Sequence, residues 1–92
     1  MIKALVLYER EVDPERYARH VELCEQVPAA AFRHGKVFGA PSGEPPHAYV
    51  AEFEWPDRES FKAALVSPEF AATGRDAMDM GVPYRVEFVD LG

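Results

Sequence analysis

The segment from Pro46 to Glu69 constrains the fold more than any other part of the chain. It predicts a strand, a tight corner at Trp55-Pro56-Asp57 and a short helix. Side chains alternate between the two faces of a strand, so the residues of one face share a largely aromatic character: His47, Tyr49, Ala51, Phe53 and Trp55. The opposite face is mixed and carries Glu52. Such a strand belongs in the middle of a sheet, with helices over its aromatic face.

The remaining elements follow from apolar periodicity and from helix start signals. Asp13-Pro14-Glu15 and Ser67-Pro68-Glu69 each place a capping side chain before a proline and an acidic residue, a pattern typical of a helix N-terminus. Apolar or alternating runs predict strands over residues 2–8, 31–38 and 84–89. We expect helices from Pro14 to about Gln26, after Asp57, and from Pro68 to about Met78.

The order of these elements predicts an α+β protein of the ferredoxin-like βαββαβ plan. Right-handed crossovers place the helices on one face of a four-stranded antiparallel sheet. The strands over residues 2–8 and 47–55 lie in the middle, and the mixed polarity of residues 31–38 suits an edge. We expect a single domain over residues 1–92, with Trp55 packed against Phe61.

The first strand, residues 2–8, is apolar on both faces. A helix-free sheet face that exposes much apolar surface is unfavourable on a monomer. We therefore expect a homodimer whose helix-free sheet faces pack against each other, with a cavity at the rim lined by residues such as Glu52.

The amino-acid composition restricts the classes of binding partner and the cellular location that we expect. The net charge is -6, and no cluster of Lys and Arg occurs, which argues against nucleic acid and anionic membranes as partners. The single cysteine, Cys24, excludes an intramolecular disulfide. No apolar run approaches the roughly 18 residues of a membrane span, and Met1 to Tyr8 lacks the features of a signal peptide. We expect a cytoplasmic protein.

The sequence also resembles the EthD family of dimeric α/β-barrel proteins over nearly its whole length. The resemblance lies in the runs IKALVLYER, KVFGAPSGEPPHAYVAEFEW and FKAALVSPEF, and above all in Ala51-Glu52, Ser67-Pro68-Glu69 and Asp76. The family's first-helix signature is partly eroded. His20 and Leu23 match its His-x-Pro-Leu run, whereas Glu22 replaces the proline and Glu15-Arg16 replace a His-Tyr pair.

This resemblance implies a small homodimeric protein of oxidative or degradative small-molecule metabolism. Related barrels include cofactor-free monooxygenases and muconolactone isomerases. The implied activity is a cofactor-independent oxidoreductase or an isomerase-like reaction in an apolar pocket between sheet and helices, with no cofactor. The alternative is a non-catalytic module for binding a small ligand or for dimerisation, and the eroded signature favours ligand binding.

Two residues are candidates for catalysis. His20 falls inside the apolar stripe of its helix, which directs the imidazole toward the sheet or the cavity rim, where it can act as a general base. The alternative is a core histidine whose ring bonds a backbone carbonyl. Glu52 lies mid-strand on the helix-free face, where burial would raise its pKa. Its alternative role is a salt bridge at the dimer interface with an arginine such as Arg33 or Arg85.

Candidates for ligand contact share an aromatic ring or a polar side chain near the expected pocket: Tyr8, Tyr17, Tyr49 and Asp76. The structural alternative is that the three tyrosines are core residues and that Asp76 is a polar contact of its helix. His34 and His47 lie on adjacent strands without a carboxylate at ligand spacing, so we expect no metal. We expect Cys24 to be buried and to pack as a small hydrophobic residue.

Overall fold

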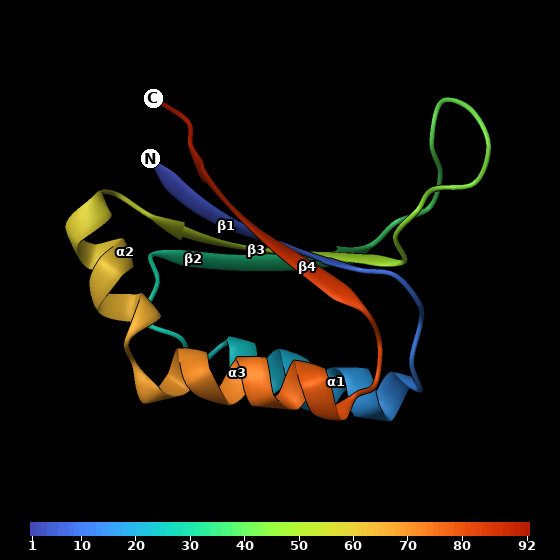
Figure 1. The fold of residues 1–92 in the computed structure, drawn as a ribbon, viewed down its shortest axis with the longest axis horizontal. Helices are drawn as coiled ribbons and strands as arrows, with labels where there is room; N and C mark the ends of the chain where they lie inside the picture. The colour runs from blue at the N-terminus through green and yellow to red at the C-terminus, as the bar shows by residue number, and fades with distance from the viewer.

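The computed structural model describes all residues from Met1 to Gly92 and has the predicted ferredoxin-like architecture (Figure 1). Four strands, β1 (Ile2–Tyr8), β2 (Ala31–Lys36), β3 (Tyr49–Trp55) and β4 (Tyr84–Asp90), form one sheet in the order β2-β3-β1-β4. Every neighbouring pair is antiparallel. The prediction that the first and third strands are central and the second lies at an edge is confirmed.

Three helices cover one face of this sheet: α1 (Pro14–Cys24), α2 (Arg58–Leu65) and α3 (Pro68–Asp79) (Figure 1). The predicted caps are present, because the side chains of Asp13, Asp57 and Ser67 accept backbone N–H groups of the first turns. The helix α3 runs beside α1, and α2 lies across the end of the sheet.

Several element boundaries differ from the prediction, and the last strand, β4, extends one residue further, to Asp90. The helix α1 ends at Cys24 rather than near Gln26, because Gln26 donates its backbone N–H to Leu23, one residue closer than α-helical bonding requires. The strand β2 ends at Lys36 instead of continuing to residue 38. The strand β3 begins at Tyr49, so His47 lies in the preceding connection.

The core lies between the sheet and the helices and is built from alternate strand residues. In β1 these are Ile2, Ala4, Val6 and Tyr8, and in β3 they are Tyr49, Ala51, Phe53 and Trp55, all buried. Trp55 meets the ring of Phe61 edge to face at 5.2 Å, as predicted, and its indole N–H donates to the carbonyl of Pro28 at 2.7 Å. The helix-covered face of the sheet is therefore fixed by aromatic packing.

The helix-free face is partly charged. Lys3 on β1 binds Glu52 and Glu54 on β3 at 2.9 and 3.6 Å, and Arg33 on β2 reaches the same two carboxylates at 3.0 and 3.5 Å. Beside these ion pairs, Leu5 and Leu7 stand half-buried. The face thus combines an apolar strip with an ordered charge network.

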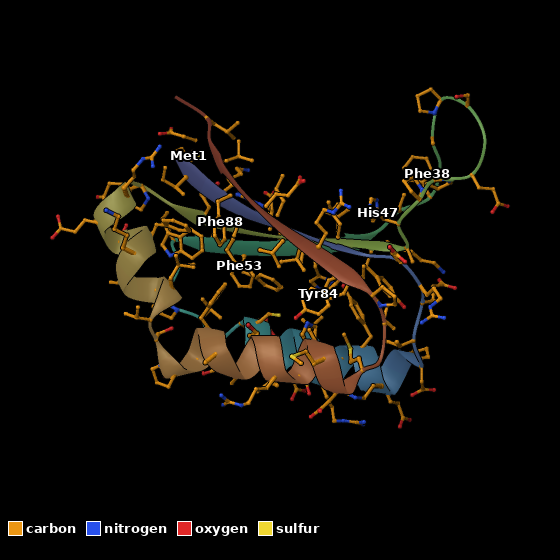
Figure 2. All side chains as sticks on the ribbon, viewed as in Figure 1. Met1, Phe38, His47, Phe53, Tyr84 and Phe88 are labelled. Carbon is orange, nitrogen blue, oxygen red and sulfur yellow. The ribbon has the colours of Figure 1, made fainter.

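The connection between β2 and β3 extends away from the helices as a long loop (Figure 1). Phe38 is fully exposed near its base (Figure 2). None of the three helices has the length and hydrophobicity that a membrane-spanning helix requires.

Candidate functional site

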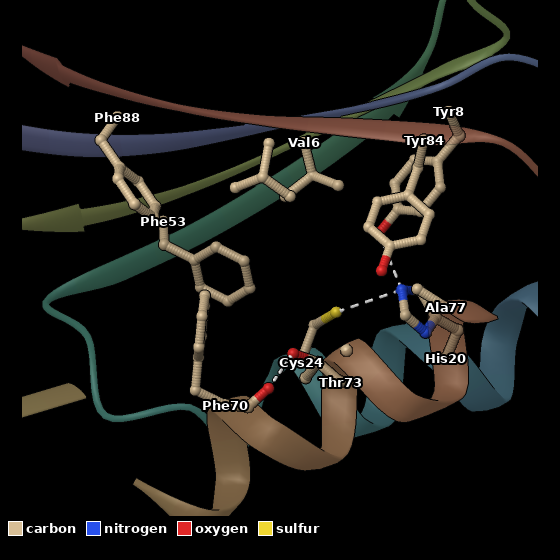
Figure 3. A pocket seen from close by; sticks show the side chains of 12 residues that line it. Val6, Tyr8, His20, Cys24, Phe53, Phe70, Thr73, Ala77, Tyr84 and Phe88 are labelled. Atoms are coloured by element: carbon tan, nitrogen blue, oxygen red, sulfur yellow. Dashed lines mark hydrogen bonds between the residues drawn. The ribbon is translucent and has the colours of Figure 1, made fainter. Parts of the chain in front are cut away.

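A cavity of about 260 Å³ lies between the sheet and the helices α1 and α3 (Figure 3). Its lining residues come from β1, β3 and β4 on one side and from the two helices on the other: Val6, Tyr8, His20, Cys24, Phe53, Phe70, Thr73, Gly74, Ala77, Tyr84, Val86 and Phe88. Most of the lining is hydrophobic. The cavity lies within one chain and needs no second copy to form.

His20 occupies one end of this cavity and is almost completely buried, with 2 % of its surface exposed. Its Nε2 atom lies 2.7 Å from the hydroxyl oxygen of Tyr8. Its Nδ1 atom lies 2.8 Å from Oδ2 of Asp76 on α3. The imidazole therefore links β1 to α3 through two side-chain hydrogen bonds, instead of bonding a backbone carbonyl as the structural alternative required.

The charges around this chain of bonds define where the protons lie. Hydrogen bonds from Arg16, and secondarily from His20, keep the pKa of Asp76 below its ordinary value, so Asp76 is a carboxylate and accepts. Burial raises the pKa of Tyr8, so its phenol stays neutral and donates. We therefore assign the imidazole proton to Nδ1, which donates to Asp76, and leave Nε2 as the acceptor for Tyr8.

Arg16 holds Asp76 by a two-pronged ion pair. Its Nη1 and Nη2 atoms donate to Oδ2 and Oδ1 of Asp76 at 2.9 and 2.7 Å, and Nη2 also reaches the Asp76 carbonyl at 3.3 Å. On a helical wheel of residues 14–26, Arg16 falls on the outer side with other charged residues, but in the structure it contacts a second helix. The helix α3 packs along α1 at this point, so the side of α1 that bears Arg16 faces a neighbour.

Cys24 adds a sulfur atom to the same end of the cavity. Its Sγ lies 3.7 Å from Nε2 of His20 (Figure 3). Burial raises the pKa of Cys24 to about 12, so the thiol is neutral. The cavity thus has one polar end, formed by Tyr8, His20 and Cys24.

The other end of the cavity is aromatic. Phe53 meets Phe70 edge to face with ring centroids 6.1 Å apart, and Phe88 meets Phe61 in the same way at 4.9 Å. Figure 3 shows Phe53, Phe70 and Phe88 grouped away from His20 and Tyr8. The cavity is suited to a molecule that is polar at one end only.

Glu52 lies on the opposite side of the sheet from this cavity. The expected rise in its pKa is wrong: the hydrogen bond from Lys3 lowers the pKa, and the hydrogen bond from Arg33 acts in the same direction. A lysine beside the strand supplies the compensating charge that the sequence argument omitted. The alternative, an ion pair with Arg33, is present within the chain. The structure therefore does not bring Glu52 and His20 together.

Two of the four expected ligand-contact residues lie outside the cavity. Tyr17 and Tyr49 stack at 4.1 Å with an interplanar angle of 10°. The hydroxyl of Tyr17 bonds Nδ1 of His34 at 3.1 Å, and the hydroxyl of Tyr49 receives the backbone N–H of Val12 at 3.2 Å. Tyr8 lines the cavity, and Asp76 contacts it through His20. No group of three or more His, Cys, Asp or Glu side chains is arranged to hold a metal ion.

The sequence analysis did not identify the cavity-lining residues of α3 and β4, although both sets follow a periodic pattern in the sequence. In α3 the lining residues Phe70, Thr73, Gly74 and Ala77 follow the helical spacing i, i+3, i+4, i+7. In β4 the lining residues Tyr84, Val86 and Phe88 alternate as one face of a strand does. The ion pair of Arg16 with Asp76 joins two helices and leaves no signal in the spacing.

Comparisons with known proteins support the fold assignment. No family model matches the sequence, and no curated protein matches it. Among solved structures, an EthD family protein from Bacillus halodurans is 25% identical, with 100% of this chain and 99% of the other covered and a TM-score of 0.84. A dimeric ferredoxin-like protein of unknown function from Jannaschia sp. is 17% identical, with 98% of each chain covered and a TM-score of 0.79.

A third similar structure is a mutant of SnoaB, a cofactor-independent oxygenase from Streptomyces nogalater. It is 18% identical, with 97% of this chain and 90% of the other covered and a TM-score of 0.62. Identities of this size establish a common fold and leave the chemistry to be argued from the site itself.

Proposed function

We propose that this EthD-like chain is a homodimeric, cofactor-independent enzyme that removes a proton from a small, largely apolar substrate. The substrate binds in the cavity between the sheet and the helices. His20 is the base, Tyr8 passes the proton to it, and Asp76 stabilises the charge that results. The proposal rests on one observation above all: a carboxylate–imidazole–phenol chain ends in an apolar cavity.

The arrangement suits proton removal because each group favours the same direction of transfer. Asp76 accepts the Nδ1 proton of His20, which leaves the Nε2 lone pair as the basic site. When Nε2 takes up a proton, the carboxylate of Asp76 lies 2.8 Å from the imidazolium. The carboxylate therefore lies where it balances the positive charge of the imidazolium as that charge forms.

The proton path can be written so that every atom is accounted for. A C–H or O–H group next to the substrate's carbonyl or aromatic ring gives its proton to the oxygen of Tyr8, and the hydroxyl proton of Tyr8 moves to Nε2 of His20. The substrate is left as an enolate or phenolate. An isomerase-like reaction returns the proton to a different substrate atom. In an oxidoreductase-like reaction dioxygen is the oxidant: the anion's carbon forms a C–O bond to it, and the resulting peroxide anion takes the proton back from His20 through Tyr8.

A second candidate function is ligand binding without turnover. The observation that favours it is the 2.7 Å bond between Tyr8 and His20, which satisfies Nε2 before any ligand arrives. A ligand bound beside this closed pair would gain apolar contacts and no proton transfer. The two functions therefore share the cavity and differ only in whether the ligand exchanges protons.

Deuterium exchange distinguishes the two functions. We expect the wild-type protein to catalyse incorporation of deuterium from heavy water into β-tetralone, an enolisable bicyclic ketone, measured by proton NMR. His20→Gln removes the base, and we expect the catalysed exchange rate to fall at least a hundredfold. The matched control is His47→Gln, because His47 lies outside the cavity and has no role in the proton path.

The outcomes of this experiment are distinct. Loss of exchange in His20→Gln with retained binding supports the enzyme. Binding of β-tetralone without any catalysed exchange in the wild type supports the ligand-binding function instead. Equal exchange rates in His20→Gln and His47→Gln would contradict the assignment of His20 as the base.

The homodimer is a separate part of the proposal. Similar structures are described as dimeric ferredoxin-like proteins, and the apolar strip of Leu5 and Leu7 on the helix-free face offers a surface for a second copy. We expect analytical ultracentrifugation to give a dimer at micromolar concentration and Leu5→Asp to give a monomer. Ala63→Asp, on the exposed side of α2, is the control. A wild-type monomer would refute the dimer and leave the cavity intact.

A further inference from the structure

Gly74 is placed where a helix would be more stable with almost any other residue. It lies in the middle of α3, and glycine in a helix interior is less favourable than alanine because it loses more backbone entropy on folding. Its backbone does not require glycine, since it is not among the residues with positive φ. A Cβ atom built at this position would have no neighbouring atom within 4 Å. Close packing therefore does not explain the glycine.

A side chain at residue 74 would occupy part of the cavity. Gly74 is half-buried and lines the cavity beside Thr73. It follows Phe70 by one helical turn on the same side of α3, so its missing side chain leaves an opening between the aromatic and polar ends.

The opening lies between α3 and the edge strand β4. On the helix-covered side of β4, Val86 and Phe88 are 40% and 53% exposed although both line the cavity. The helix α3 packs against α1 and barely contacts β4. Figure 1 shows β4 and α3 at the same edge of the two layers, with no further element beyond them. Solvent therefore reaches the cavity from this edge.

We propose that Gly74 keeps open a mouth between α3 and β4 through which a planar bicyclic aromatic ligand with one polar group enters. This inference rests on the proposed function and names the substrate class of that same cavity. A cavity of about 150 Å³ holds benzene, so the 260 Å³ here is suited to two fused rings. The polar group enters first and lies against Tyr8 and His20, while the rings lie between Phe70 and Phe88.

The experiment places a side chain in the mouth, in the space that the rings of a bound ligand occupy, so it changes the equilibrium affinity and leaves the polar end unaltered. The variant is Gly74→Leu, and Ala71→Leu is its control, because Ala71 lies exposed on the same helix and does not line the cavity. The probes are β-naphthol, with two rings, and phenol, with one. Binding is measured by isothermal titration calorimetry and stability by thermal unfolding.

We expect Gly74→Leu to bind β-naphthol at least tenfold more weakly than the wild type and to change phenol affinity by less than threefold. Its Tm should equal or exceed that of the wild type, because leucine is the better helix former. Ala71→Leu should bind both probes as the wild type does. If Gly74→Leu does not fold, Gly74→Ala takes its place, with a raised Tm and a smaller loss of β-naphthol affinity expected.

Unchanged β-naphthol affinity in the folded Gly74 variant would refute the proposal that Gly74 keeps a mouth open. The proposed enzymatic function would be unaffected if deuterium exchange persisted. Equal weakening of phenol and β-naphthol would also overturn it, since a general defect in the cavity is not selection by size. A wild type that binds neither probe and exchanges no deuterium would overturn the proposed function together with this inference.

Discussion

Removing the carboxylate of Asp76 should destabilise the fold and uncouple two helices. In Asp76→Ala, the Nδ1–H of His20 is left buried without an acceptor, because only 2% of His20 is exposed. An unsatisfied buried donor costs about 1–3 kcal/mol. Arg16 loses its two-pronged ion pair, but its side chain is 23% exposed and reaches water, so that loss adds only about 0.5–1 kcal/mol.

The expected loss in the free energy of unfolding is therefore about 1.5–4 kcal/mol. For a domain of this length each kcal/mol lowers Tm by roughly 4–8 °C, so the Tm of Asp76→Ala should fall by roughly 6–32 °C. Urea denaturation followed by circular dichroism measures the free energy, and differential scanning calorimetry measures Tm. Glu22→Ala, which removes an exposed carboxylate from α1, is the control and should stay within about 0.5 kcal/mol.

A double-mutant cycle isolates the contact between the helices. If Arg16 acts through Asp76, the effect of Arg16→Met should largely disappear in the Asp76→Ala background, with a coupling energy of about 0.5–1 kcal/mol. An Asp76→Ala variant as stable as Glu22→Ala would refute the reasoning, because it would mean that His20 and Arg16 find other partners without cost.

Three further predictions follow from the same contacts. Since Arg16, and then His20, hold the pKa of Asp76 below its ordinary value of 3.8, this carboxylate contributes stability above that pH, which is lost as the pH falls through the lowered pKa. Urea titrations across the acid range should thus show a steeper loss in the wild type than in Asp76→Ala. Tyr8→Phe leaves the acceptor Nε2 of His20 with only the weak S–H donor of Cys24, 3.7 Å away, and should cost about 1–2 kcal/mol in urea denaturation while slowing deuterium exchange into β-tetralone. Trp55→Phe loses the hydrogen bond to the Pro28 carbonyl and part of a buried ring, so it should cost about 2–3 kcal/mol by calorimetry; a loss below 0.5 kcal/mol would contradict that bond.

Local signals in the sequence predicted the architecture. Asp13-Pro14 and Ser67-Pro68 mark helix starts through backbone chemistry that acts within one turn, and both helices begin at the predicted proline. The alternation assigned Tyr49, Phe53 and Trp55 to the helix-covered face correctly, whereas His47, predicted on the same face, lies outside the strand. These features depend on residues a few positions apart, which is why a single sequence reveals them.

The site could be predicted only in part, because it depends on distances between elements. The apolar stripe of α1 pointed His20 toward the sheet, as observed. Nothing local indicated that Arg16 meets Asp76, since the position of α3 beside α1 is a tertiary property. Glu52 shows the same limit: its partner Lys3 lies on another strand, and the ion pair reversed the predicted direction of the pKa shift.

The central position of β1 has a consequence for how the protein is made. The strand β1 is synthesised before both of the strands with which it pairs, β3 and β4. At ordinary rates of synthesis, a strand apolar on both faces therefore waits for several seconds before its second neighbour exists. Pairing over such long separations also slows folding. The nascent chain should accordingly depend on chaperones that shield Ile2 to Tyr8, and it should aggregate most readily when synthesis is slow.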